Sequence, residues 1–310
     1  MPAWLDLSAS ARAAVETELG GPVDPEGISY NADVTRPALD VVLRAVGGGT
    51  AHLKAMAVGH VSAGFHDAER DVHLAVGDRL PAPPMTWSAE VGGWKLMLFT
   101  SLDSRPANLR PGHSDMSMVL RMLTRLGNTL TPAPWPSSRS AASRVEFLRA
   151  AMARALDDPC LASASERATL GDALSLINPG DLDGDSLLHL NLNPTTLRRT
   201  MRRLYVTDWN TACHGPRWLD AARLAPSLIE AGHDASQAWR LLVEHVPALK
   251  SAPQKTLIGI AALDAIGRLE QARNAPRDRA DAWCAASSAA AGWLRFCIHG
   301  PIGRCLDLVV

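Results

Sequence analysis

The spacing of hydrophobic residues predicts a mixed α/β region at the start of the chain. Residues 8–19 place apolar side chains at helical spacing after a serine cap, and two glycines follow, which predicts an amphipathic helix. Two apolar runs, 38–46 and 50–58, flank a glycine triplet and predict a β-hairpin. A helix near 62–76 and a buried strand within 92–102 complete this region.

From about Arg110 onward the pattern becomes helical, because apolar residues recur at intervals of three and four. A turn-rich connector at 131–141 interrupts this pattern. We predict helices within the following ranges: 113–130, 145–156, 166–177, 221–232, 236–249, 254–274 and 279–298. No internal repeat is visible, so the chain is expected to end in a large, mostly helical region.

Composition narrows the class of protein. With 310 residues, 47% of them hydrophobic, the chain can bury the core of one large domain or of two smaller lobes. A formal net charge of −1 provides no field for binding nucleic acid or an anionic membrane surface. The start lacks the pattern of a signal peptide, and no apolar run of about 18 residues predicts a membrane span.

The five cysteines are odd in number and form no C-x-x-C pair, which predicts a reduced, cytoplasmic protein. Cys297, His299 and Cys305 lie close in sequence, but their spacing fits no common metal site. Buried free thiols are the better interpretation of these cysteines.

The segment from Gly184 to Asp220 carries the most specific pattern, GDSLLHLNLNPTTLRRTMRRLYVTDWNTACHGPRWLD. It resembles the catalytic half of the aminoglycoside phosphotransferase and choline kinase-like family, in the form common in actinobacteria. In that family a loop L-L-H-G-D-L-x-x-x-N-L precedes a strand ending in V-D-W and then G-x-P-W-x-D-L-A. The matching residues are His189, Asp208, Trp209, Gly215, Pro216, Trp218 and Asp220.

The resemblance extends from about Leu39 to Glu230 and implies an α+β, protein-kinase-like bilobal fold. It places a small β-rich N-lobe at 1–103, with an N-terminal helix, an antiparallel sheet and an αC-like helix. A larger, mostly α-helical C-lobe would cover 104–310, with the catalytic loop at 187–197 and the metal-site strand at 204–209.

The resemblance also implies a nucleotide site. In the family a lysine on the third strand holds the nucleotide phosphates and pairs with a helix glutamate, and Lys54 and Glu69 match these positions. The alternative is a surface lysine and a solvated glutamate. Phe99 and Ser101 fall in the hinge, where backbone groups hold adenine. The chain has four lysines, which makes each of them conspicuous: Lys54, Lys95, Lys250 and Lys255.

The resemblance implies roles for three further residues. Asp208, at the end of an apolar strand, would supply an oxygen ligand to Mg²⁺ bridging the phosphates of ATP. Its alternative role is to brace the following turn. Asp220 matches an aspartate that accepts backbone hydrogen bonds from the catalytic loop, and His189 matches the histidine that packs within that loop.

The loop departs from the family at the residues that should do chemistry. Asn191 stands in place of the catalytic aspartate, Thr196 in place of the metal-binding asparagine, and Leu190 in place of a glycine. An amide offers a neutral dipole where an ionised aspartate accepts a proton. Loss of a general base lowers a rate by about 10²–10⁴-fold. Thr196 could offer one hydroxyl to a cation.

The phosphate loop and the acceptor side also differ from the family. Residues 26–39 keep Gly27 alone, with Ser29, Asn31 and Thr35 as hydrogen-bond donors. The last 35 residues contain three acids, Asp278, Asp281 and Asp307, which argues against a polycationic aminoglycoside. A less basic ligand is favoured by these residues: His214, His299, Arg217, Trp218, Trp283 and Trp293, although most of the tryptophans are expected in the core.

Three hypotheses follow. The first is a pseudokinase or repurposed kinase-fold protein that binds a small molecule, a nucleotide or a protein or peptide partner, with a natural-product pathway as one setting for it. The alternative is an ATP- and Mg²⁺-dependent small-molecule O-phosphotransferase, which would use Lys54, Glu69 and Asp208, with Asn191 orienting the acceptor hydroxyl. The third is a purely structural interaction protein whose cleft is closed.

Overall fold

A computed structural model describes residues 3–30, 38–135 and 139–300. The chain divides into two compact units: Met1–Arg105 with Arg198–Thr211, and Pro106–Leu197 with Ala212–Val310. The boundary expected from the sequence, 103/104, placed residues 198–211 in the helical part. They belong to the first unit because the backbone N–H of Val206 donates to the Pro81 carbonyl at 2.7 Å.

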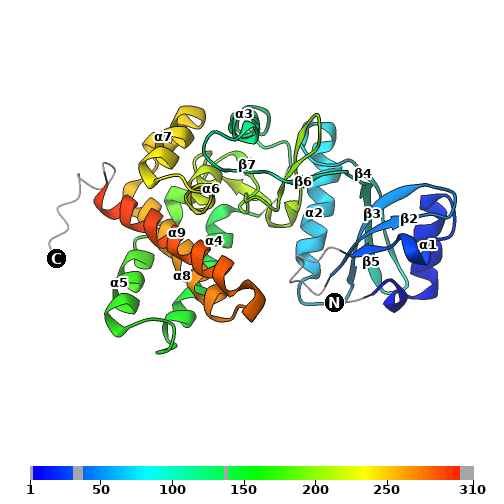
Figure 1. The fold of residues 1–310 in the computed structure, drawn as a ribbon, viewed down its shortest axis with the longest axis horizontal. Helices are drawn as coiled ribbons and strands as arrows, with labels where there is room; N and C mark the ends of the chain where they lie inside the picture. The colour runs from blue at the N-terminus through cyan, green and yellow to red at the C-terminus, as the bar shows by residue number, and fades with distance from the viewer. Residues whose placement is uncertain (1–2, 31–37, 136–138, 301–310) are drawn as a thin grey trace. The chain divides into compact units, whose positions relative to one another are not determined.

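A five-stranded antiparallel sheet forms the centre of the first unit, in the order β1–β2–β3–β5–β4 (Figure 1). The strands are β1 (Ser29–Tyr30), β2 (Leu39–Arg44), β3 (Thr50–Ala57), β4 (Met85–Val91) and β5 (Trp94–Thr100). The predicted hairpin is confirmed as β2 and β3. Strand β4 was missed, although Gly92 and Gly93, with φ of 58° and 82°, supply the turn signal of a second hairpin.

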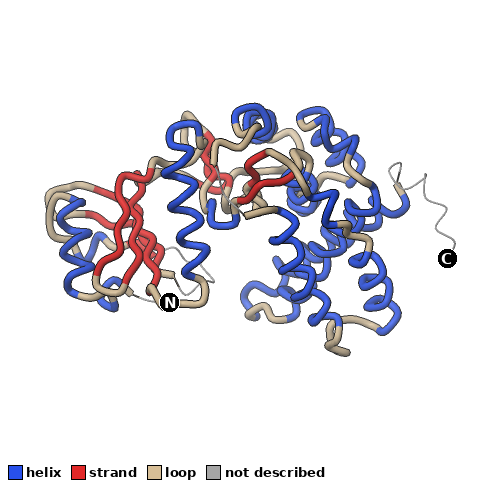
Figure 2. Tube along the Cα trace, turned by 180° about the vertical axis from the view of Figure 1, so that it is seen from behind, coloured by secondary structure: helices blue, strands red, loops and turns tan. Residues whose placement is uncertain are grey.

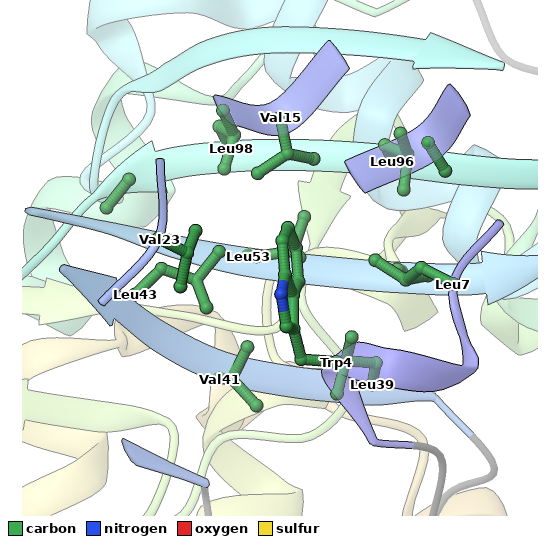
Figure 3. Close-up of a cluster of buried hydrophobic side chains, with 13 residues drawn as sticks. Trp4, Leu7, Val15, Val23, Leu39, Val41, Leu43, Leu53, Leu96 and Leu98 are labelled. Atoms are coloured by element: carbon green, nitrogen blue, oxygen red, sulfur yellow. The ribbon is translucent and has the colours of Figure 1, made fainter. Parts of the chain in front are cut away.

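One face of this sheet packs against the N-terminal helix α1 (Ala9–Leu19) and the preceding short helix η1 (Trp4–Asp6). The side chain of Ser8 accepts a hydrogen bond from the Ala11 N–H, and Gly20 ends the helix at φ 85°. Alternate strand residues such as Leu39, Val41, Leu53 and Leu98 meet Trp4, Leu7 and Val15 in one buried cluster (Figure 3).

The opposite face of the sheet meets helix α2 (Ala63–Val76), as Figure 1 shows. The short helix η5 (Trp209–Thr211) packs on α2, and the fully buried Trp209 donates its indole N–H to the Val206 carbonyl at 2.9 Å. These contacts hold the preceding residue, Asp208, near the sheet face that carries Lys54.

The second unit is mostly helical (Figure 2). Each predicted helix is present: α3 (Ser114–Thr129), α4 (Ala141–Leu156), α5 (Ala164–Ser175), α6 (Leu219–Glu230), α7 (Ala235–His245), α8 (Gln254–Arg273) and α9 (Ala280–His299). Its short strands β7 (Ser186–Leu188) and β10 (Cys213–Gly215) pair antiparallel. A three-stranded sheet consists of β6 (Arg105–Pro106), β8 (Leu197–Arg199) and β9 (Leu204–Val206), and β9 belongs to the first unit.

The remaining short helices are η2 (Pro25–Gly27), η3 (Gly77–Arg79), η4 (Pro179–Leu182), η6 (Pro247–Ser251) and η7 (Arg277–Arg279). Within the described ranges, no helix has both the length and the apolar character needed to cross a bilayer.

Candidate functional site

Lys54 lies at the centre of a buried charge cluster in the first unit. Its Nζ donates to Glu69 Oε1 at 2.7 Å and also to Asp208 Oδ1. The side chains of Lys54 and Glu69 are 9% and 4% exposed, whereas that of Asp208 is 35% exposed. The contact predicted between Lys54 and Glu69 is present. Asp208 contacts the same ammonium group, which was not predicted.

The cluster keeps Lys54 charged. Burial alone would lower the pKa of Lys54, but the carboxylates of Asp208, Glu69 and Asp40 outweigh burial and raise it. Burial raises the pKa of Glu69, and the ammonium group of Lys54 opposes that rise. Because water is largely excluded, these charges interact more strongly than a surface pair would.

The backbone at Asp208 is unusual for a residue with a side chain. Its φ is 63°, in the left-handed region that Asp and Asn tolerate better than most residues. The residue follows β9 directly, and the buried Trp209 anchors the chain after it. At this turn the Asp208 carboxylate accepts a hydrogen bond from Lys54.

The two predicted hinge residues lie in and after β5. Phe99 is 3% exposed, and its ring centroid lies 5.5 Å from Lys54 Nζ and 5.0 Å from the ring of His73, edge-on. Ser101 follows the end of the strand and is half-buried. Phe99 therefore forms an apolar wall beside the charge cluster.

A second polar pair on the same sheet was not predicted. His52 Nε2 lies 2.6 Å from Asp40 Oδ1, and Asp40 is the cross-strand partner of Lys54. The signal was present in the sequence, because His52 and Lys54 are two residues apart on β3 and therefore share one face of the sheet. Asp40 brings a third carboxylate close to Lys54.

Helix α2 carries two histidines near this cluster, the buried His66 and the half-buried His73. Burial, reinforced by the charge of Lys54, lowers the pKa of His66 to about 4 and that of His73 to about 3. In the unfolded chain a histidine titrates near 6.5. As the pH falls below 6.5, the unfolded state binds more protons than the folded state, so stability is lost down to the folded pKa values.

A pH-dependent loss of stability is therefore expected, and replacing one histidine should reduce it. Between pH 6.5 and pH 5, the wild type should lose about 1.5 kcal/mol more of its free energy of unfolding than His73→Gln. Urea unfolding at several pH values measures this difference. Parallel pH profiles for the two proteins would contradict it.

The loop of the second unit is held by two residues of α6. The Asp220 carboxylate accepts hydrogen bonds from the backbone N–H groups of His189 (2.9 Å) and Leu190 (2.7 Å). Arg223, one turn further along α6, donates to the Leu190 carbonyl at 2.8 Å. Asp220 and Arg223 thus bind both polar backbone groups of Leu190. The bracing geometry expected of Asp220 is present, and Arg223 is an addition that the sequence analysis missed.

These bonds explain how Leu190 keeps a backbone conformation that favours glycine. Leu190 has φ 61°, a conformation that costs a residue with a Cβ about 1–2 kcal/mol. Its side chain is 2% exposed, and burying a leucine contributes about 1.5–3 kcal/mol. Burial and the two anchored backbone groups therefore outweigh the strain.

Asn191 and Thr196 hydrogen-bond mainly within the loop. The Asn191 side-chain oxygen accepts a hydrogen bond from Asn193 Nδ2 at 3.3 Å. The backbone N–H of Asn191 donates to His189 Nδ1 at 3.2 Å. The Thr196 hydroxyl accepts from the Asn193 N–H at 3.1 Å and lies 3.0 Å from the Asn191 carbonyl. Thr196 is 2% exposed, so a role as metal ligand would require these contacts to break.

A cavity of about 550 Å³ lies beside this loop, entirely within the second unit. We call it the acceptor cavity; its lining includes Asn191, Asn193 and Trp283. The lining also includes three carboxylates that lie outside the last 35 residues and were not predicted: Glu230, Asp264 and Glu270. Their sequence positions alone give no sign that they share a cavity with Asn191.

The other candidate ligand-binding residues lie in the core or away from the acceptor cavity. Trp218 and Trp293 are buried in the core, as expected for most tryptophans. Arg217 lines a separate cavity of about 380 Å³, and His214 Nε2 lies 2.6 Å from the Trp135 carbonyl.

The expected phosphate-loop residues are only partly visible. Asn31 and Thr35 lie outside the described residues, as do Cys305 and Asp307. A Cβ on Gly27 would lie 2.8 Å from the Cβ of Arg44, so this glycine allows close approach of the chain to β2. That packing role explains Gly27 without a bound phosphate.

The candidate residues thus form two groups. Lys54, Glu69, Phe99 and Asp208 belong to the first unit, whereas the loop residues and Asp220 belong to the second. Among the described residues, no group of three or more His, Cys, Asp or Glu side chains is arranged to hold a metal ion.

No family model matches the chain, and no curated protein sequence matches it. Its fold is similar to that of choline kinase LicA from Streptococcus pneumoniae, with TM-score 0.62 and 11% identity over 92% of this chain and 97% of the other. A choline/ethanolamine kinase family protein from Mesorhizobium loti has TM-score 0.56 and 13% identity, covering 94% and 96% of the two chains.

A third structure is aminoglycoside phosphotransferase APH(3'')-Id from Streptomyces rimosus, in complex with ADP and streptomycin. It has TM-score 0.57 and 14% identity over 82% of this chain and 97% of the other. Likeness at these identities shows the fold alone. The predicted kinase-like fold, with an antiparallel sheet in one part and a helical remainder, is confirmed.

Proposed function

We propose that this protein is a small-molecule O-phosphotransferase that uses ATP and a divalent cation. The contact of Lys54 with both Glu69 and Asp208 carries the proposal, because it brings a permanent cation and a partly exposed carboxylate together. The fold, shared with choline kinases and an aminoglycoside phosphotransferase, supports it. The alternative of a small-molecule kinase is thereby favoured over a pseudokinase.

Lys54 would hold the phosphates of the nucleotide. Glu69, nearly fully buried, fixes the direction of the lysine side chain through their 2.7 Å bond. Asp208 is the more exposed of the two carboxylates that Lys54 contacts. An incoming phosphate would therefore compete with Asp208 for Lys54, while Glu69 keeps the ammonium group in place.

Asp208 fits the requirements of a magnesium ligand. Mg²⁺ in kinases is commonly bound by one or two carboxylates together with substrate phosphates, so a complete cage of side chains is not needed. Asp208 supplies a hard oxygen donor at the end of β9, beside Lys54. Bound there, the cation would offset negative charge on the phosphates.

Asn191 would orient the acceptor hydroxyl and not remove its proton. Its amide oxygen can accept a hydrogen bond from an alcohol, but it remains neutral at physiological pH. The transition state of phosphoryl transfer is loose, so positioning accounts for much of the catalysis. The enzyme should therefore be active but slow.

A second candidate is a nucleotide-binding protein without turnover. Two observations favour it: Asn191 carries no charge, and the Thr196 hydroxyl is engaged inside its own loop. Absence of ATP-dependent phosphorylation of any alcohol, together with retained nucleotide binding, would support this candidate over the first.

Nucleotide binding should be visible as thermal stabilisation that requires Mg²⁺ and Asp208. ATP with Mg²⁺ at about 100 times the dissociation constant should add about 2.7 kcal/mol of stability. In Asp208→Asn the Mg²⁺-dependent part of this gain should disappear, because the amide replaces a charged ligand.

Asp71→Asn is the matched control for this measurement. Asp71 is an exposed carboxylate on α2, with a side-chain exposure of 39%, close to that of Asp208, and it pairs with Arg70. It should keep the full Mg²⁺ response. An Asp208→Asn protein that responds like the wild type would remove Asp208 from the proposed metal site.

A further inference from the structure

The acceptor cavity has the size of a small-molecule site. Its volume of about 550 Å³ lies within the range of about 300–1,000 Å³ typical of ligand pockets. Loop residues 190–195 form one wall, and side chains from α4, α6, α8 and α9 form the others. A ligand in this cavity would therefore contact Asn191 directly.

The charges of the cavity largely neutralise one another. Its lining holds two arginines and three carboxylates, which gives a net charge of −1. Arg223 binds Asp264 Oδ1 through Nε at 3.2 Å and Nη2 at 2.9 Å. Arg268 pairs with Glu230 at 3.6 Å. Glu270 supplies the remaining charge.

Paired carboxylates are poor partners for a cationic ligand. A polycation would have to break the pairs of Asp264 and Glu230, and each break would leave an arginine to repel it. An anion gains nothing from a lining with a negative net charge. The cavity therefore selects against ligands that carry several charges of either sign.

The rest of the lining is suited to an apolar molecule that carries hydroxyl groups. Half of the lining residues are apolar, among them Leu192, Leu263 and Trp283. Neutral polar side chains also line the cavity, among them Asn191 and Gln271, and an amide can exchange hydrogen bonds with a ligand hydroxyl.

We propose that the acceptor cavity binds an uncharged alcohol with an apolar body. This inference rests on the proposed function for its chemical step. In that step a bond forms between the alcohol oxygen and the γ-phosphorus of ATP, and the bond from that phosphorus to the β,γ-bridging oxygen breaks. ADP leaves, and the hydroxyl proton passes to solvent.

Calorimetric titration of the full chain without nucleotide tests the binding. Octyl β-D-glucopyranoside below its micelle concentration serves as the uncharged probe, and kanamycin serves as the polycation. We expect saturable binding of the glucoside, at least about tenfold tighter than kanamycin. Gly267 lines the cavity, so Gly267→Leu places a larger side chain in it and should abolish binding of the glucoside.

Two substitutions on α8 provide a matched pair. Arg268→Gln leaves Glu230 unpaired and takes the net charge of the lining to −2, so kanamycin should bind about five- to tenfold tighter while the glucoside changes little. Arg273→Gln makes the same change on the same helix, but Arg273 pairs with Asp158 and does not line the cavity. It should alter neither affinity.

Tighter binding of kanamycin than of the glucoside to the wild type would overturn the inference. So would equal effects of the two arginine substitutions, or the absence of glucoside binding. Phosphorylation is assayed separately with ATP and Mg²⁺. Glucoside that binds but is never phosphorylated contradicts the proposed function and leaves the cavity assignment intact, whereas phosphorylation of kanamycin alone contradicts the cavity assignment.

Discussion

Lys54→Met should lower the free energy of unfolding by about 3–5 kcal/mol and abolish the stabilisation by ATP and Mg²⁺. Removing the ammonium group leaves Glu69 as a buried carboxylate next to Asp208, and breaking a buried pair costs about this much. Methionine keeps most of the volume of the lysine stem, so the loss reflects charge more than packing. Chemical denaturation measures the first effect, and thermal shift with nucleotide measures the second.

Lys95→Met is the control for Lys54→Met. Lys95 lies on the neighbouring strand β5 and contacts both carboxylate oxygens of Asp67 at 2.6 Å, but this pair is more exposed. Lys95→Met should lower the free energy of unfolding by about 1 kcal/mol or less and keep the stabilisation by nucleotide. If Lys54→Met does not fold, Glu69→Gln still tests the site, because it keeps the size of Glu69 and should weaken the response to ATP. Unchanged stability in Lys54→Met would contradict the charge cluster.

Asn191→Asp should raise the phosphorylation rate by about 10²–10⁴-fold. The substitution restores a general base of nearly the same shape, and such a base contributes about this factor, or about 3–5 kcal/mol of activation free energy. The hydrogen bond that Asn193 Nδ2 donates to the residue 191 side chain can persist with a carboxylate. ATP-dependent phosphorylation of an alcohol bound in the acceptor cavity is the measurement.

Asn193→Asp is the matched control, since it makes the same change two residues away in the same loop. Its amide donates to the Asn191 carbonyl at 3.0 Å, so the carboxylate would disturb the loop without supplying a base to the acceptor. Asn193→Asp should not raise the phosphorylation rate. A wild type and an Asn191→Asp variant that both bind ATP and both lack turnover would favour the second candidate function. A decrease in rate on restoring the carboxylate would contradict the role proposed for Asn191.

The helices and the β2–β3 hairpin could be predicted from the sequence, because they depend on local and repeated signals, whereas the kinase-like fold was predicted from the resemblance of the segment from Gly184 to Asp220 to a known family. The cap at Ser8, the stop at Gly20 and the long amphipathic spacings give α1 and the helices of the second unit. The scarcity of lysine and the motif spacing singled out Lys54, Glu69 and Asp208, which meet in the structure. Strand β4 was missed although Met85, Trp87, Ala89 and Val91 alternate with polar residues, which is the pattern of a half-buried strand.

The details of the site depend on contacts between residues that are distant in the sequence. Arg223 and Asp264 are 41 positions apart, and their contact depends on how α6 and α8 pack. The same packing makes the acceptor cavity nearly neutral, a property that no count of charges along the chain reveals. The Thr196 hydroxyl turns into its own loop because a buried hydroxyl needs partners, and Asn191 and Asn193 supply them. Spacing along the chain identifies which residues belong to a motif, but long-range packing fixes which charges meet and which remain accessible to a ligand.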